Sequence, residues 1–208
     1  MAFDFSGKAI VVTGGAAGLG KAFCEDLVTR GARIGVADIE GEKAKAVAAE
    51  IGPSAWGFQV DVSDRGSVEA LADEAWTAFG RVDGIFNNAG IGAGRDILRT
   101  AEEDLDWVLG VNLKGVWYGC QVFGQRFRDQ GGPALIVNTG SEHSLGVPHL
   151  RGGAYTASKH AVHGLSDILR REVPEDIQVS LFCPGIVATE IWNSGRNRPA
   201  NIGGPSEA

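Results

Sequence analysis

Short apolar segments alternate with longer segments of helical periodicity along the chain. Six of the apolar segments have the length of strands, and most of them are apolar at nearly every position instead of at every second one. This pattern is typical of parallel strands that are buried on both faces of a sheet. The predicted strands are Lys8–Thr13, Arg33–Asp38, Trp56–Val60, Val82–Asn87, Ala134–Thr139 and Gln178–Cys183.

Five longer segments between these strands have apolar residues at helical spacing and predict helices. Ser63 and Asp64 can cap the third helix, and Gly31 and Gly80 follow the first and the third as stop signals. The alternation of strands and helices predicts a three-layer, doubly wound α/β fold with a parallel sheet, the Rossmann fold. The predicted helices are Gly18–Arg30, Gly41–Ile51, Asp64–Phe79, Glu102–Gln130 and Ala154–Glu172.

Length and glycine content narrow this picture. The 208 residues suffice for one domain with its own core. We expect this domain at residues 1–193, followed by a loop-like C-terminal tail at residues 194–208. The 31 glycines are about twice the average share and follow no collagen-like period. They predict tight turns and places where the backbone closely approaches a neighbour or a ligand.

Charge and cysteine content exclude several classes of protein. The net charge is −7, with 26 acidic and 19 basic residues, which argues against a nucleic-acid partner. No apolar run is long enough to span a membrane, and the start lacks the pattern of a signal peptide, so we expect a cytoplasmic protein. Cys24, Cys120 and Cys183 have no metal-binding spacing and are expected to be small hydrophobic residues. No metal site is predicted.

A glycine-rich segment, Thr13 to Gly20, connects the first predicted strand to the first predicted helix. Such a turn lets backbone N–H groups and the helix dipole face a pyrophosphate. Asp38 ends the second strand, where a carboxylate can accept hydrogen bonds from ribose hydroxyls and would repel a 2′-phosphate. These residues predict a dinucleotide site that prefers NAD to NADP. The alternative is that Asp38 caps a helix and that the glycines are only structural.

Tyr155 and Lys159 lie four residues apart at the start of the last predicted helix, and therefore on one helix face. A phenol with a pKa near ~10 is a poor base at neutral pH, and a neighbouring ammonium lowers that pKa. The pair is therefore a candidate proton-transfer group. Taken alone, a Tyr and a Lys four residues apart are also explained by ordinary packing of the ring and solvent exposure of the ammonium.

Together these motifs resemble the classical short-chain dehydrogenase/reductase family over nearly the whole chain. The family's T-G-x-x-x-G-x-G matches Thr13 to Gly20, its N-N-A-G matches Asn87 to Gly90, and its Y-x-x-x-K matches Tyr155 and Lys159. Further matches are Asp61-Val62, Asn112, Ser141 and the turn Pro184 to Thr189. The resemblance implies that the cofactor is bound by Thr13, Gly14, Ala16, Ala17, Gly18, Leu19, Gly20, Asp38, Ile39, Asp61, Val62, Asn88, Ala89, Gly90, Tyr155, Lys159, Pro184, Gly185, Val187 and Thr189.

The resemblance also implies four catalytic roles. Tyr155 exchanges the substrate proton, and Lys159 lowers its pKa and binds the nicotinamide ribose. Ser141 holds the substrate oxygen, and Asn112 anchors a water in a proton relay. The spacing from Ser141 to Tyr155 is one residue longer than usual, so Ser144 remains a second candidate for the serine. The usual spacing would reach Glu142, whose carboxylate would repel an oxyanion.

The implied activity is hydride transfer between NAD(P) and a secondary alcohol or ketone. The alternatives are an NAD-binding sensor or scaffold with little turnover, and an epimerase or dehydratase that uses the same cofactor. Family position makes Glu142, His143 and Trp192 substrate candidates, along with the loop Ile91–Arg95, Val147 and Leu150. The alternative interpretation of Glu142 and His143 is that they are two exposed loop residues.

Two further expectations come from the family pattern alone. Relatives continue through a substrate-covering segment and a seventh strand after the Pro184 turn, so we expect a partial lid and six strands, in a shortened or unusually short chain. The resemblance also implies a homodimer or a homotetramer.

Overall fold

A computed structural model of the chain describes residues 3–92, 96–146 and 152–185. Within these ranges a six-stranded parallel sheet has the order β3-β2-β1-β4-β5-β6. This order confirms the predicted doubly wound fold, since the chain moves outward from β1 in one direction and then returns to β4 on its other side. The strands are β1 (Ala9–Thr13), β2 (Arg33–Asp38), β3 (Ala55–Gln59), β4 (Gly84–Asn87), β5 (Ala134–Thr139) and β6 (Ile177–Phe182).

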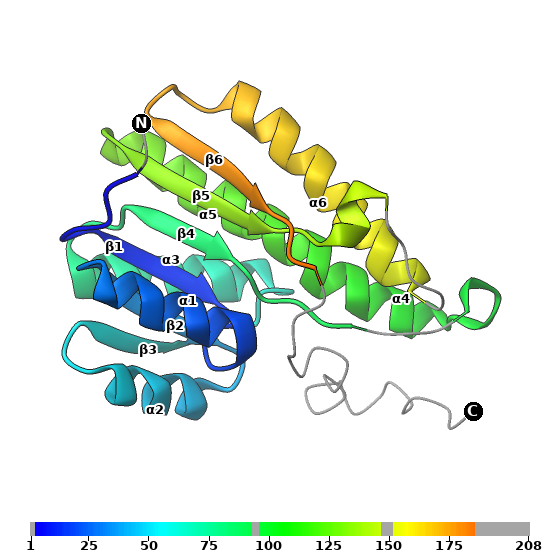
Figure 1. The fold of residues 1–208 in the computed structure, drawn as a ribbon, viewed down its shortest axis with the longest axis horizontal. Helices are drawn as coiled ribbons and strands as arrows, with labels where there is room; N and C mark the ends of the chain where they lie inside the picture. Colours follow the sequence, from blue (N-terminus) through cyan, green and yellow to red (C-terminus); the bar gives the residue numbers. More distant parts are fainter. Residues whose placement is uncertain (1–2, 93–95, 147–151, 186–208) are drawn as a thin grey trace.

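Helices cover both faces of the sheet (Figure 1). One apolar layer packs α1 and α2 against β1 and β2, through residues such as Cys24 and Val47. The other packs α3, α5 and α6 against the opposite face, with Phe123 and Phe127 among its largest fully buried side chains. The helices are α1 (Gly18–Thr29), α2 (Gly41–Ile51), α3 (Arg65–Phe79), α4 (Glu102–Leu109), α5 (Gly115–Gln130) and α6 (Gly153–Glu172). None of the described helices is both long and apolar enough to cross a membrane.

The segment Glu102–Gln130 is not the single regular helix that its periodicity predicts. A π-helical turn, η2 (Gly110–Lys114), separates α4 from α5. Such insertions frequently occur at functional sites, because they redirect a side chain from the regular helical pattern. Here the turn contains Asn112, whose contacts are described below. Apolar periodicity cannot reveal a one-residue insertion of this kind.

Burial alternates along strand β6, in contrast to the continuous burial of β1 and β5. Ile177 and Val179 are buried, whereas Gln178, Ser180 and Phe182 are exposed. Within the described ranges β6 is an edge strand, paired only with β5, and α6 packs against it. The predicted tail, residues 194–208, lies outside the described residues.

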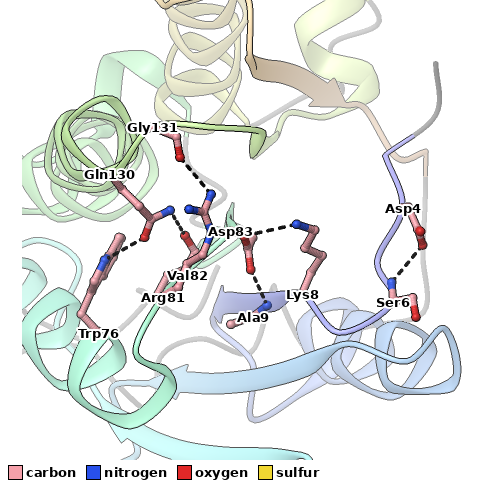
Figure 2. A network of polar contacts seen from close by, with 10 residues as sticks. All are labelled: Asp4, Ser6, Lys8, Ala9, Trp76, Arg81, Val82, Asp83, Gln130 and Gly131. Carbon is pink, nitrogen blue, oxygen red and sulfur yellow. Dashed lines mark hydrogen bonds and ion pairs between the residues drawn. The ribbon is translucent and has the colours of Figure 1, made fainter.

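At the amino ends of the strands, a buried carboxylate links β1 to β4 (Figure 2). Asp83 precedes β4, and its Oδ2 accepts a hydrogen bond from the Ala9 N–H at 3.0 Å. Its Oδ1 lies 2.6 Å from Arg81 Nε and 3.6 Å from Lys8 Nζ. Burial alone would raise the pKa of Asp83, but these hydrogen bonds and positive charges outweigh it and hold the pKa below its ordinary value.

This pKa direction predicts the pH dependence of one contribution to stability. The contribution of Asp83 is fully present above the unfolded-state pKa near ~4 and is lost as pH falls through the lower folded-state pKa. We expect Asp83→Asn to reduce the unfolding free energy at pH 7 by about 1–3 kcal/mol, because charge-assisted hydrogen bonds are lost. Denaturant titrations at several pH values measure the unfolding free energy. The difference in unfolding free energy between the variant and the wild type should shrink in acid.

Asp73→Asn is the matched control. Asp73 pairs with Arg126 but is largely exposed, so its replacement should change stability little at any pH. Equal losses in the two variants, or a loss for Asp83→Asn that stays constant down to pH 3, would contradict the role assigned to Asp83.

Candidate active site

The predicted cofactor and catalytic residues that the structure describes gather at the carboxyl ends of the strands. Strand register aligns Thr13 with Ala37 and Asn87 with Asn138, so the segments that follow β1, β2, β4 and β5 leave the sheet at one edge. The order of the strands reverses between β1 and β4, and in open α/β sheets this is where ligands bind.

The glycine-rich loop packs backbone to backbone against the segment after β4. Gly14 has φ +64°, and a Cβ there would lie 2.9 Å from Ala89 Cα. A Cβ on Gly20 would collide with the carbonyl oxygen of Gly14. Thr13 Oγ1 accepts hydrogen bonds from the Asn88 and Ala89 N–H groups at 3.0 and 3.1 Å. These glycines are therefore required by the close approach itself, besides any role in binding.

The loop leads into a helix end that suits an anion. Helix α1 begins at Gly18 with Ala17 at its N-cap; no side chain caps it, and its first turn contains no acidic residue. The first N–H groups of a helix need acceptors, and a phosphate can supply them. The glycine-rich loop and the uncapped N-terminus of α1 thus both fit the pyrophosphate of a dinucleotide.

Asp38 holds the same loop from the side of β2. Its Oδ2 accepts a hydrogen bond from the Ala16 N–H at 3.1 Å, and its Oδ1 accepts one from the Glu40 N–H at 3.1 Å. The N-cap of α2 is Glu40, so Asp38 does not occupy the capping position that the alternative interpretation requires. The bond to Ala16 shows that Asp38 also positions the loop, which sequence reasoning did not identify.

Three other predicted cofactor positions follow β2 and β3. Asp61 follows β3, and its carboxylate accepts hydrogen bonds from the Ser63 backbone and hydroxyl at 2.9 and 2.6 Å. Val62 is buried beneath Gly115, where a Cβ would lie 2.8 Å from Val62 Cγ2. Ile39, next to Asp38, is largely exposed.

Asn112 is buried and its side chain is held at both ends. Its Oδ1 accepts from the Ile91 N–H at 2.8 Å, and its Nδ2 donates to the Ile91 carbonyl at 2.9 Å and to Ser158 Oγ at 3.2 Å. The π-turn thereby joins the segment after β4 to α6. Both hydrogens of the amide nitrogen are used in these contacts, so a water in a relay would have to donate to Oδ1 or bind to neighbouring atoms.

Tyr155 and Lys159 are both buried on one face of α6. Lys159 Nζ donates to the Thr139 carbonyl at 2.7 Å, and lies 5.7 Å from the centre of the Tyr155 ring. Burial lowers the pKa of Lys159 to about 8. The ammonium is therefore held between the end of β5 and the phenol.

The pKa of Tyr155 differs from what the family resemblance implies. Burial raises it, a hydrogen bond with Ser141 opposes this, and the negative charge of Glu142 adds to the increase. The net direction is upward, because burial disfavours the charged phenolate and the Glu142 carboxylate disfavours it further. In this structure the neutral phenol is favoured, which suits a proton donor.

The two candidate serines have different surroundings in the 3₁₀ turn η3 (Glu142–Leu145). Ser141 precedes the turn and its hydroxyl hydrogen-bonds with Tyr155. The Ser144 hydroxyl instead donates to the Lys159 carbonyl at 2.8 Å and accepts from the Ser141 N–H at 3.1 Å. The geometry supports Ser141 as the substrate-facing hydroxyl.

Glu142 and His143 are not simply two exposed loop residues. His143 is 2% exposed, its Nδ1 lies 2.7 Å from Thr156 Oγ1, and its ring meets the Tyr155 ring edge-on at 5.2 Å. Glu142 is partly buried, and a Cβ on Gly185 would lie 3.6 Å from its Oε2. The Glu142 N–H donates to the Pro184 carbonyl at 2.9 Å, which joins η3 to the turn after β6.

Several predicted positions lie outside the described residues. They are the cofactor candidates Val187 and Thr189, the substrate candidates Val147, Leu150 and Trp192, and residues 93–95 of the loop after β4. In the described part of the chain, no group of three or more His, Cys, Asp or Glu side chains has the arrangement of a metal site.

Comparisons with known proteins agree with this geometry. A family model described as short chain dehydrogenase matches residues 8–200. D-threitol dehydrogenase from Mycolicibacterium smegmatis is 37% identical over 203 residues, which are 95% of this chain and 77% of the relative. The 2,5-dichloro-2,5-cyclohexadiene-1,4-diol dehydrogenase of Sphingobium indicum is 35% identical over 202 residues, 96% of this chain and 80% of the relative.

A solved structure extends the similarity to three dimensions. The crystal structure of a short-chain dehydrogenase/reductase from Burkholderia phymatum in complex with NAD has a TM-score of 0.94 and 36% sequence identity. The match covers 99% of this chain and 75% of that one. Sequence, fold and site geometry together show that this chain belongs to the short-chain dehydrogenase/reductase family, whose NAD(P)-binding Rossmann fold it shares.

Proposed function

We propose that the protein is an NAD-dependent dehydrogenase that interconverts a secondary alcohol and its ketone. The observation that carries this proposal is the convergence of Ser141, Tyr155 and Lys159 at the end of β5, next to Gly90 in the segment that packs against the glycine-rich loop. Each of the three provides a different chemical group at the place where a substrate oxygen could meet a nicotinamide ring. When bound, NAD would supply the hydride acceptor for the alcohol carbon.

The residues of the chain handle the proton and hold the substrate. In the direction of ketone reduction, the neutral Tyr155 phenol donates its proton to the ketone oxygen, and in alcohol oxidation the phenolate accepts the hydroxyl proton. The Ser141 hydroxyl hydrogen-bonds to the same oxygen and orients it. In this proposal the buried Lys159 ammonium, 5.7 Å from the centre of the Tyr155 ring, would stabilise the phenolate when Tyr155 gives up its proton.

Preference for NAD follows from the carboxylate of Asp38. It lies at the carboxyl end of β2, next to the loop that suits the pyrophosphate. A carboxylate there accepts hydrogen bonds from ribose hydroxyls and repels a 2′-phosphate. The neighbouring Ala17 and Ile39 carry no positive charge that would attract that phosphate.

We further propose that the substrate carries a second hydroxyl group. The relatives from M. smegmatis and S. indicum are named for threitol and for a cyclohexadienediol, both alcohols with more than one hydroxyl. The Glu142 carboxylate is near enough to Tyr155 for its charge to affect the pKa of the phenol, and it lies against Gly185. It could accept a hydrogen bond from a hydroxyl next to the reacting one.

We also propose that the protein forms a homo-oligomer. The outer faces of α4, α5 and α6 present Leu105, Trp117 and Ile168, which are 38%, 52% and 48% exposed. Exposed apolar side chains of this size on adjoining helices are typical of surfaces that bind another chain. A homodimer or homotetramer that packs these helices together would bury them.

Tyr155→Phe tests the acid/base assignment. It removes the only oxygen of the phenol and retains the ring that packs against His143. We expect kcat for alcohol oxidation to fall by about 10²–10⁴-fold, while the affinity for NAD, measured by calorimetry, changes little. A variant that keeps a substantial fraction of kcat would overturn the assignment. Wild-type protein that binds NAD but produces no NADH from a panel of secondary alcohols and diols would favour the sensor or scaffold.

Asp38→Asn tests the basis of cofactor preference. The amide oxygen can still accept from the Ala16 N–H, while the NH₂ group no longer accepts from the Glu40 N–H and the negative charge is removed. The ratio of kcat/KM with NADP to kcat/KM with NAD should rise by about 10-fold, the size of one charge repulsion in a partly solvated site. An unchanged ratio would show that other residues set the preference.

Glu142→Gln tests the electrostatic coupling to Tyr155. Removing the negative charge lowers the pKa of the phenol, since the charge of Glu142 is one cause of its increase. The rise of kcat for alcohol oxidation with pH should therefore shift to lower pH. A pH profile that coincides with that of the wild type would show that the Glu142 charge does not affect proton transfer by Tyr155.

A further inference from the structure

The turn that carries the candidate serine is joined to the catalytic helix by three hydrogen bonds, which we call the η3–α6 seam. His143 Nδ1 lies 2.7 Å from Thr156 Oγ1, Ser144 Oγ donates to the Lys159 carbonyl at 2.8 Å, and His163 Nδ1 donates to the Ser144 carbonyl at 3.1 Å. The three positions on α6 are spaced three and four residues apart, so they form one stripe along the helix.

Ser144 is the central contact of this seam. Its hydroxyl has a single hydrogen, which is donated to the Lys159 carbonyl, and its lone pair accepts from the Ser141 N–H at 3.1 Å. One buried side chain thus connects the backbone of the substrate-facing serine to the backbone of the lysine. Ser144 is 4% exposed and Ser141 is 6% exposed, so water cannot easily replace this connection.

The rest of the turn offers little apolar anchorage. Leu145 is 61% exposed, and Gly146 ends the turn in a left-handed conformation with φ +87°. At the other end, Gly140 has no room for a side chain, because a Cβ there would lie 2.9 Å from Cys183 Sγ and 3.0 Å from Ser144 Oγ. Backbone hydrogen bonds from Gly140 to Phe182 and from Glu142 to Pro184 hold the residues on either side of Ser141, and the Ser141 N–H between them has Ser144 Oγ as its acceptor.

We propose that Ser144 is a positioning residue, which holds the Ser141 hydroxyl at the distance from Tyr155 that proton transfer requires. The proposal rests on the dehydrogenase function inferred above. Replacing Ser144 by alanine leaves the buried Ser141 N–H without its acceptor. The Lys159 carbonyl still accepts the backbone hydrogen bond of the helix, because it lies inside α6. The variant therefore leaves the Ser141 N–H, and not the Lys159 carbonyl, without a hydrogen-bond partner.

Ser144→Ala should therefore reduce kcat without weakening the binding of the cofactor. A displacement of one reacting group by about 1 Å can cost about 10²-fold in rate, so we expect kcat to fall about 10- to 100-fold. The KM for NAD should stay unchanged, because the hydrogen bonds of the seam involve the carbonyl of Lys159 and not its ammonium, and no residue of the glycine-rich loop. Steady-state kinetics with the alcohol that the wild type oxidises fastest measure both values.

Ser166→Ala is the matched control. Ser166 lies on the same helix, is fully buried, donates to the Val162 carbonyl at 2.7 Å and accepts from Asn138 Nδ2 at 3.0 Å. It thus loses a donor and an acceptor in the same way as Ser144, but it does not touch Ser141. We expect a similar loss of thermal stability in both variants and a lower kcat only in Ser144→Ala. Equal effects on kcat, or no effect in either variant, would overturn the proposal.

A second measurement does not depend on activity. Hydrogen exchange of the Ser141 amide should accelerate in Ser144→Ala and remain slow in Ser166→Ala, because only the first variant removes its acceptor. Slow exchange in Ser144→Ala would refute the connection itself. If the exchange result is as expected and the wild type oxidises no alcohol, the proposed function fails and the structural connection stands.

Discussion

The hydroxyl of Thr13 holds together the two segments between which the site is built. It donates to the Phe86 carbonyl at 3.2 Å and accepts from the N–H groups of Asn88 and Ala89. Asn88 returns a hydrogen bond to the Thr13 carbonyl at 3.0 Å. These contacts bind the end of β1 to the end of β4, at the point where the strand order reverses. The close approach of the two segments depends on these contacts, and it leaves room only for glycine at positions 14 and 20.

The remaining parts of the site are positioned by polar groups that α6 shares with its neighbours. Lys159 donates a hydrogen bond to the end of β5, and Ser158 accepts one from the Asn112 amide in the π-turn. Ser144, in η3, donates one to the backbone of α6. Each contact is buried, where an unmade hydrogen bond would be costly. A buried polar arrangement of this kind specifies one geometry more narrowly than apolar packing does, because each donor must meet an acceptor at a particular distance and angle. The catalytic helix is thus oriented by directional contacts on several sides.

Most of the fold could be predicted from the sequence because its elements are strongly patterned. Strands β2 and β5 and helix α2 have the predicted bounds, since apolar runs and glycine stop signals mark their ends. The π-turn at Asn112 was not predictable, because one extra residue in a helix leaves its apolar periodicity nearly intact. The alternating burial of β6 follows the alternation of apolar and polar residues from Ile177 to Ser180, whereas its place at the edge of the described sheet is set by the tertiary structure.

By itself the sequence determined the doubly wound fold, the glycine-rich loop with Asp38, and the pairing of Tyr155 with Lys159 on one helix face, because all three depend on local pattern and short spacing. Only the tertiary structure distinguishes the surroundings of Ser141 and Ser144, since the two hydroxyls differ in their hydrogen-bond partners and not in residue type. It also decided the direction of the pKa of Tyr155, which depends on burial and on the charge of Glu142. Burial and charge proximity arise from segments distant in the sequence, so they exist only once the chain has folded.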